Sequence, residues 1–157
     1  MRDGNERLDG VAGFQPRDTD YRSRVTESFE RQPFVNLVGG ELRRVDPGKV
    51  DIALPFKPEL AQQHGYVHGG VITSIADAAA GCAAMTLAAV EVGVLTTELK
   101  VNFLRPARDG VLCAKGRVIK TGRTLTIVQA DVTEMRDGEE VHVLTGLVTL
   151  ISVEGLI

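Results

Sequence analysis

One 20-residue stretch, residues 71–90, constrains the fold more than any other part of the sequence. It holds eight alanines, no lysine or arginine, and one acidic residue, Asp77. Alanine has the highest helix propensity, and a helix that is apolar around most of its circumference is normally surrounded by protein. An aspartate near the centre of a bilayer costs about 2.5–3.5 kcal/mol, which alanine does little to offset. The stretch therefore predicts a buried helix in a soluble protein.

The sequence on both sides of this helix alternates between apolar and polar residues, which is typical of half-buried strands. No helix separates the later strands, so a parallel sheet is not expected. We predict an α+β fold in which a curved antiparallel sheet of five to six strands wraps around one long central helix. A short amphipathic helix is expected over residues 21–34. The expected strands cover residues 41–45, 50–54, 95–103, 111–120, 124–132 and 141–152.

The length and composition predict one globular domain. The chain has 157 residues, of which 43% are hydrophobic and 25% charged. We place the domain at residues 21–157 and expect residues 1–20 to form a polar, flexible arm without the apolar run of a signal peptide. A net charge of −3 and an aromatic content of 4% argue against a nucleic-acid partner. The two cysteines form no disulfide framework, which favours a reducing, cytoplasmic location.

The glycine pair Gly69-Gly70 opens the predicted helix. The first N–H groups of a helix have no acceptor within it and carry the positive end of its dipole, so they can polarise a carbonyl oxygen. Glycine also allows another group to approach the backbone closely. The alternative is that the two glycines only shape a turn.

Asp77 is the only charged residue between His68 and Glu91. A carboxylate in an apolar helix suits a general base or a nucleophile, and the alternative is a core aspartate whose hydrogen bonds are satisfied. Gly69 and Asp77 are eight residues apart, about 12 Å along a helix axis. One chain cannot bring both to the same carbonyl group. If both act on one substrate, they come from two chains related by a two-fold axis.

The segment 100–123 carries seven basic residues and one acidic residue. This local excess favours a small ligand that bears phosphate groups, although ordinary solvated strand faces would explain it equally well. His64 and His68 have the i, i+4 spacing of metal ligands, but no third ligand is near them in the sequence, so no metal site is expected. The basic residues are Lys100, Arg105, Arg108, Lys115, Arg117, Lys120 and Arg123.

Residues 62–77 resemble the hotdog-fold acyl-CoA thioesterases of the PaaI type, the phenylacetate-degradation family. The resemblance rests on the run from Gln62 to Gly70, which contains His-Gly-Gly, and on Asp77 after six further residues. Residues 97–106 and 118–123 are similar to later strands of the family. In all, the resemblance covers about residues 34–150.

This resemblance implies a role for each matching residue. Asp77 would be the general base or nucleophile, and the Gly69 N–H would polarise the thioester carbonyl with support from His68. Gln62 would orient the water or the thioester, although many members have asparagine there, and Thr96 would hold the water. The residues near the coenzyme A phosphates would be Gly70, Arg105, Lys120, Gly122, Arg123 and Thr124.

The family also implies hydrolysis of a small, medium or aromatic acyl-CoA without a further cofactor. It implies homodimers with active sites at the subunit interface, assembled as dimers of dimers. Two alternatives remain open. One is a hotdog enoyl-CoA hydratase or dehydratase that uses His68 in acid–base chemistry, and the other is a protein that binds acyl-CoA without catalysis.

Overall fold

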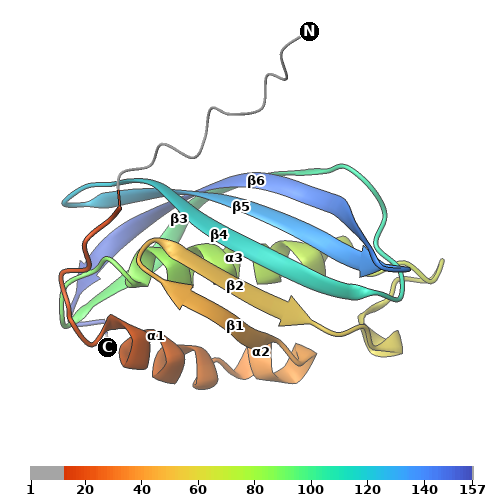
Figure 1. The fold of residues 1–157 in the computed structure, drawn as a ribbon, viewed down its shortest axis with the longest axis horizontal. Coiled ribbons are helices and arrows are strands. Elements are labelled where there is room, and N and C mark those ends of the chain that lie inside the picture. Colours follow the sequence, from red (N-terminus) through yellow and green to blue (C-terminus); the bar gives the residue numbers. More distant parts are fainter. Residues whose placement is uncertain (1–12, 157) are drawn as a thin grey trace, which may run out of the picture.

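The computed structural model describes residues 13–156, which form a six-stranded antiparallel sheet wrapped around one long helix, α3 (Gly69–Met85) (Figure 1). The predicted hotdog fold is confirmed. The strands lie in the order β1-β2-β4-β5-β6-β3, so β1 and β3 are the two edges. Their bounds are β1 Glu41–Asp46, β2 Lys49–Leu54, β3 Val92–Phe103, β4 Val111–Thr121, β5 Leu125–Arg136 and β6 Glu139–Glu154.

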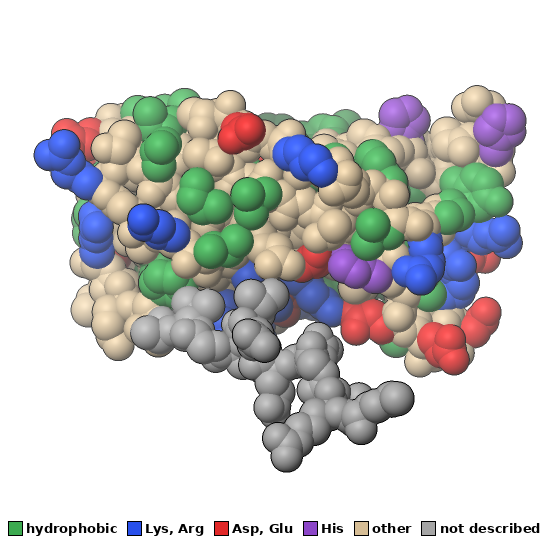
Figure 2. Space-filling view, turned by 90° about the horizontal axis from the view of Figure 1, so that it is seen from above, with side chains coloured by type: hydrophobic (Ala, Val, Ile, Leu, Met, Phe, Trp, Pro, Cys, Tyr) green, Lys and Arg blue, Asp and Glu red, His purple; other side chains and the backbone are tan. Residues whose placement is uncertain are grey.

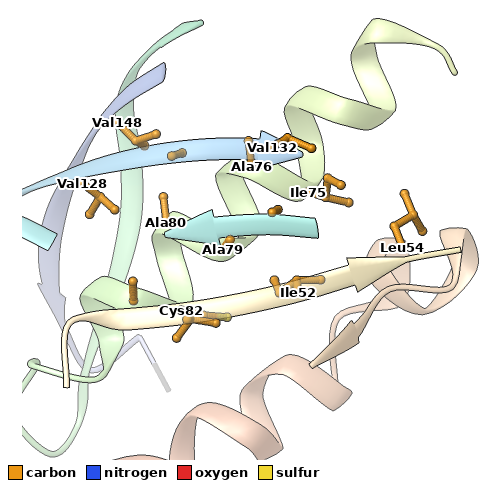
Figure 3. Packing of buried hydrophobic residues seen from close by; sticks show 14 of the residues in the cluster. Ile52, Leu54, Ile75, Ala76, Ala79, Ala80, Cys82, Val128, Val132 and Val148 are labelled. Carbon is orange, nitrogen blue, oxygen red and sulfur yellow. The ribbon is translucent and has the colours of Figure 1, made fainter. Parts of the chain in front are cut away.

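The alanines of α3 allow the sheet to come close to the helix. Ala76, Ala79 and Ala80 are fully buried and point toward the strands (Figure 3). Opposite them, Gly116 of β4 has no side chain, and a Cβ atom there would lie 2.3 Å from the Ala79 carbonyl oxygen. Small residues on both elements therefore set the helix–sheet distance. Larger side chains fill the remaining space, among them Ile52 of β2.

The predicted N-terminal helix is present, but a second one follows it. α1 (Tyr21–Glu30) ends before Pro33, and α2 (Pro33–Val38) begins with that proline. Proline is favoured in the first turn of a helix because its missing N–H would have no partner there. Pro33 therefore begins α2 and also separates it from α1. A short 3-10 helix, η1 (Pro58–Leu60), lies in the loop before α3.

Arg24 connects α1 to the C-terminal end of α3 through hydrogen bonds. The Arg24 guanidinium group donates to the carbonyl oxygens of Met85, Ala88, Ala89 and Val92. These groups include carbonyls that the end of a helix leaves unpaired. Of the predicted arm, residues 1–12 lie outside the described residues, while Phe14 packs against the β1–β2 turn at Gly48.

The edge strand β3 is irregular in its middle. It pairs with β6, and within residues 13–156 its other edge pairs with no strand. The register shifts between Thr96 and Glu98, so Thr97 is an extra residue that bulges the strand. No helix in the described residues is long and apolar enough to cross a bilayer.

Candidate active site at the start and middle of α3

The turn that leads into α3 is held by backbone hydrogen bonds on both sides. The His68 N–H donates to the Leu60 carbonyl oxygen at 2.8 Å, and the Val67 N–H donates to the Ala107 carbonyl oxygen at 2.9 Å. The first bond joins the turn to η1, and the second joins it to the loop between β3 and β4. The start of the helix therefore has a fixed position relative to two loops.

His68 caps the helix with its side chain. Its Nδ1 accepts a hydrogen bond from the Gly70 N–H at 2.9 Å, so Nδ1 is unprotonated in this arrangement. The Gly70 N–H is thus already paired, whereas the Gly69 N–H has no acceptor within residues 13–156. The structure thus places these two predicted site residues next to each other. His68 supports the turn, and Gly69 presents its N–H group.

A hollow of about 390 Å³ opens beside Gly69, and we call it the Gly69 hollow. Gln62 lines it, and because the Gln62 side-chain oxygen accepts from the His64 N–H, its Nε2 is the atom left to donate. Its walls combine apolar groups with Arg105. The remaining lining residues are Tyr66, Val67, Ile72, Phe103, Leu104, Pro106 and Ala107.

Sequence reasoning did not single out Phe103, although its ring covers Gly69. A Cβ atom on Gly69 would lie 3.1 Å from Cζ of that ring. Phe103 lies at the end of β3, 34 residues beyond Gly69 in the chain, and is half exposed. No local pattern relates the two residues, because only the sheet order places this strand end beside the start of α3.

Asp77 lies on the half-buried side of α3 and accepts a hydrogen bond from Thr96 of β3. The distance from Thr96 Oγ1 to Asp77 Oδ1 is 2.7 Å. Thr96 is therefore the threonine that is hydrogen-bonded to the Asp77 carboxylate. The bulge at Thr97 follows Thr96 directly. Asp77 does not line the Gly69 hollow of its own chain. The structure thus places Gly69 and Asp77 at two different points along α3 in each chain.

The residues predicted to lie near phosphate groups occur at both ends of the molecule. Gly70 lies in the first turn of α3, and Arg105 lies in the loop after β3, beside that end of the helix. By contrast, Gly122, Arg123 and Thr124 form the β4–β5 turn beside the other end of α3, just after Lys120. The two ends are well separated in Figure 1. That turn lines a second hollow of about 650 Å³.

The basic segment 100–123 does not form one patch. Lys115 pairs with Glu140, and Arg117 pairs with Asp51 at 2.5 Å. The hydrogen bond from Lys115 holds the pKa of Glu140 below its ordinary value. The view in Figure 2 likewise shows basic side chains spread among acidic and apolar ones. Within residues 13–156, no group of three or more histidines, cysteines and acidic residues could hold a metal ion.

Comparison with known proteins agrees with this fold. The thioesterase superfamily matches residues 64–141, which include the Gly69 turn, Asp77 and Thr96. A solved thioesterase family protein from Silicibacter pomeroyi shares 40% identity with a TM-score of 0.84, covering 86% of this chain and 99% of that one. The fold and these matches together define a hotdog thioesterase.

Two curated proteins extend the comparison. A Saccharolobus solfataricus protein provisionally named an esterase is 36% identical over 106 residues, which are 68% of this chain and 70% of that protein. A Listeria monocytogenes protein named 1,4-dihydroxy-2-naphthoyl-CoA hydrolase is 27% identical over 97 residues, covering 62% and 79%. The chain belongs to the hotdog thioesterase superfamily, a class of hydrolases, as the residues around His68 and Asp77 predict.

Proposed function

We propose that the protein is an acyl-CoA thioesterase that releases a free acid and coenzyme A. The observation that carries the proposal is the hydrogen bond from Thr96 to Asp77, which orients a carboxylate on α3. The Gly69 N–H at the start of the same helix, which has no acceptor within residues 13–156, supplies the second group that hydrolysis needs, a donor to the oxygen of the thioester.

The two groups act together if the protein is a homodimer. Along one helix they are about 12 Å apart, too far to meet one carbonyl group. A two-fold axis that sets two α3 helices antiparallel places Asp77 and Thr96 of one subunit beside Gly69 of the partner subunit. Each dimer then has two equivalent sites, and we propose that two dimers assemble into a tetramer.

In this site Asp77 accepts a proton from water while the water oxygen bonds to the thioester carbon. The Gly69 N–H stabilises the negative charge that develops on the carbonyl oxygen. The C–S bond then breaks, and the thiolate of coenzyme A takes up the proton. Direct attack by Asp77 through an acyl-enzyme anhydride is the other route, and it still requires the same two groups. Gln62 orients the water or the thioester through its Nε2.

The coenzyme A part of the substrate is assigned to the predicted basic residues. Antiparallel helices bring the β4–β5 turn of one subunit toward the Gly69 hollow of the other. Lys120, Gly122, Arg123 and Thr124 would thus join Gly70 and Arg105 around the phosphate groups. The CoA hydrolase name of the Listeria relative supports this substrate class.

The apolar part of the Gly69 hollow, which includes Val67, Ile72 and Phe103, suits a small, medium or aromatic acyl group, and Arg105 is left for the phosphate groups. The reaction needs no metal and no further cofactor, since Asp77 and Gly69 supply the base and the oxyanion donor. Both cysteines are free, which fits the reducing cytoplasm in which we place the activity.

The test is thiol release from short, long and aromatic acyl-CoAs by the native protein and by Asp77→Asn. We expect release with at least one class of substrate and a loss of two or more orders of magnitude in the variant, with the oligomer unchanged. Undiminished release by Asp77→Asn would refute the assignment. Conversion of an enoyl-CoA without thiol release would favour a hydratase, although His68 Nδ1 is occupied as a helix cap. Tight binding of acyl-CoA without turnover would indicate a binding protein.

A further inference from the structure

Glu134 is a fully buried carboxylate that the proposed mechanism does not use. It lies in β5, opposite Leu112 of β4, near the end of the sheet where β4 begins. A buried carboxylate is costly unless hydrogen bonds and opposite charge compensate it. The hydrogen bonds of the Glu134 carboxylate therefore indicate which part of the protein it stabilises.

Within residues 13–156, the side-chain hydrogen bonds of Glu134 lead to the loop between β3 and β4. Its Oε1 accepts from the Arg108 N–H at 2.8 Å and from the Gly110 N–H at 3.0 Å. Its Oε2 accepts from Arg136, which in turn donates to the Pro106 carbonyl oxygen at 3.0 Å. We call this arrangement the Glu134–Arg136 clasp. It holds loop 104–110 at three backbone positions.

The loop held by the clasp forms one wall of the Gly69 hollow. Arg105, Pro106 and Ala107 all line that hollow. Next to them, Arg108 lies over the ring of Tyr66 at 5.2 Å and donates to its hydroxyl oxygen. The clasp therefore fixes a wall of the hollow from behind, through main-chain groups and away from the hollow itself.

The same loop also holds the turn that presents Gly69. The Ala107 carbonyl oxygen accepts the N–H of Val67, and Val67 is two residues before Gly69. Ala107 and Val67 are both buried, so this bond is protected from water. A continuous set of contacts thus leads from Glu134 through the loop to Val67, in the turn that presents the Gly69 N–H.

We propose that Glu134 is a positioning residue: its Oε1 holds loop 104–110 so that the loop places the Gly69 N–H and the wall of the hollow for the substrate. The kinetic part of this proposal rests on the proposed thioesterase function. Since a displacement of 1 Å in a catalytic arrangement can lower a rate about 100-fold, a carboxylate outside the hollow can strongly affect turnover.

Two matched double variants test the role of Oε1. Glu134→Gln with Arg136→Met removes both charges and keeps an oxygen that can accept from the loop. Glu134→Leu with Arg136→Met removes the charges and the acceptor. Neither leaves a buried charge unpaired, and replacing a buried ion pair by apolar residues is often tolerated. If the leucine variant does not fold, Glu134→Met is used in its place, because methionine also lacks a strong acceptor and adapts to irregular space.

The first measurement is thiol release from the acyl-CoA that the native protein hydrolyses fastest. We expect kcat/KM within about threefold of the native value for the glutamine variant and a loss of tenfold or more for the leucine variant. Equal kcat/KM in the two variants would refute the proposal. Asp51→Asn, which breaks the pair with Arg117, controls for a general loss of stability. Neither residue lines the hollow, so its kcat/KM should equal the native value.

The second measurement is hydrogen exchange at the amides of Val67, Arg108 and Gly110. We expect exchange at least tenfold faster in the leucine variant than in the glutamine variant at all three. Unchanged exchange at Val67 would refute the link between the clasp and the Gly69 turn. This measurement needs no turnover, so absence of thiol release in the native protein would refute the proposed function and leave the clasp testable.

Discussion

Thr96 Oγ1 donates a hydrogen bond to Asp77 Oδ1 at 2.7 Å, so a hydroxyl group on the edge strand β3 fixes the orientation of the carboxylate on α3. The bond joins residues 19 positions apart in the chain and leaves Oδ2 without a hydrogen bond within residues 13–156. A carboxylate held through one oxygen presents the other in a defined direction. This relationship makes Asp77 suitable as a base.

Replacing Thr96 by valine should lower kcat by about one to two orders of magnitude. Valine has nearly the same shape but cannot donate, and a hydrogen bond to a charged group contributes about 1.5–3 kcal/mol. Steady-state thiol release with the best acyl-CoA measures the effect. Thr96→Ser, which keeps the hydroxyl group, should recover most of the activity. Equal kcat values for the valine and serine variants would show that this hydrogen bond does not matter for turnover.

Replacing Gly116 by alanine should destabilise the protein by about 1–3 kcal/mol or more, because it overpacks the contact between β4 and α3. The added Cβ would lie 2.3 Å from the Ala79 carbonyl oxygen, and a backbone atom cannot turn aside as a side chain can. Chemical denaturation measures the change. Gly13→Ala is the matched control, since a Cβ there would have no atom within 4 Å. If Gly116→Ala is as stable as the control, α3 can move away from β4 without a loss of folding free energy.

Local patterns predicted the elements of this fold better than their arrangement. The alanines of residues 71–90 indicated the central helix, and alternation indicated the strands, because both depend on residues close together in the chain. The helix ends at Met85, five residues before the predicted end. The glycine in β4 that lets α3 approach closely could not be recognised, since its partner Ala79 is 37 residues away.

The candidate site shows the same limit. His68, Gly69 and Asp77 stand out because their chemistry is unusual within one short segment. Phe103 and Glu134 approach the site only through the sheet order and the loop after β3, and neither breaks a local pattern strongly. Residues that act through packing or through main-chain contacts could therefore be recognised only from the structure.

Replacing Thr86 by valine should cost about 1–3 kcal/mol of stability. Thr86 is fully buried, and its Oγ1 accepts from the Gly48 N–H at 2.7 Å while donating to the Ala83 carbonyl oxygen at 2.6 Å. Valine fills the same space but leaves the buried Gly48 N–H unpaired. Thermal unfolding measures the loss, with the exposed Thr19→Val as control. Equal melting temperatures for the two variants would contradict a structural role for this hydroxyl group.

Cys82 should not react with thiol reagents while the protein is folded. Burial raises the pKa of its thiol to about 12, although Gln32 partly opposes this by hydrogen bonding. Only the thiolate is the nucleophile, so at pH 8 roughly one Cys82 side chain in 10⁴ is reactive even before access is considered. Burial also raises the pKa of the Cys113 thiol, but that side chain is only half buried.

An aromatic disulfide reagent at pH 8 should therefore modify one thiol per chain slowly in the native protein and two rapidly in denaturant. Raising the pH from 7 to 9 should speed the native reaction, because a larger fraction of Cys113 becomes thiolate. In Cys113→Ser the native reaction should disappear while one thiol still reacts after unfolding. Rapid modification of native Cys113→Ser would mean that the core around Cys82 opens readily, since this thiol is buried.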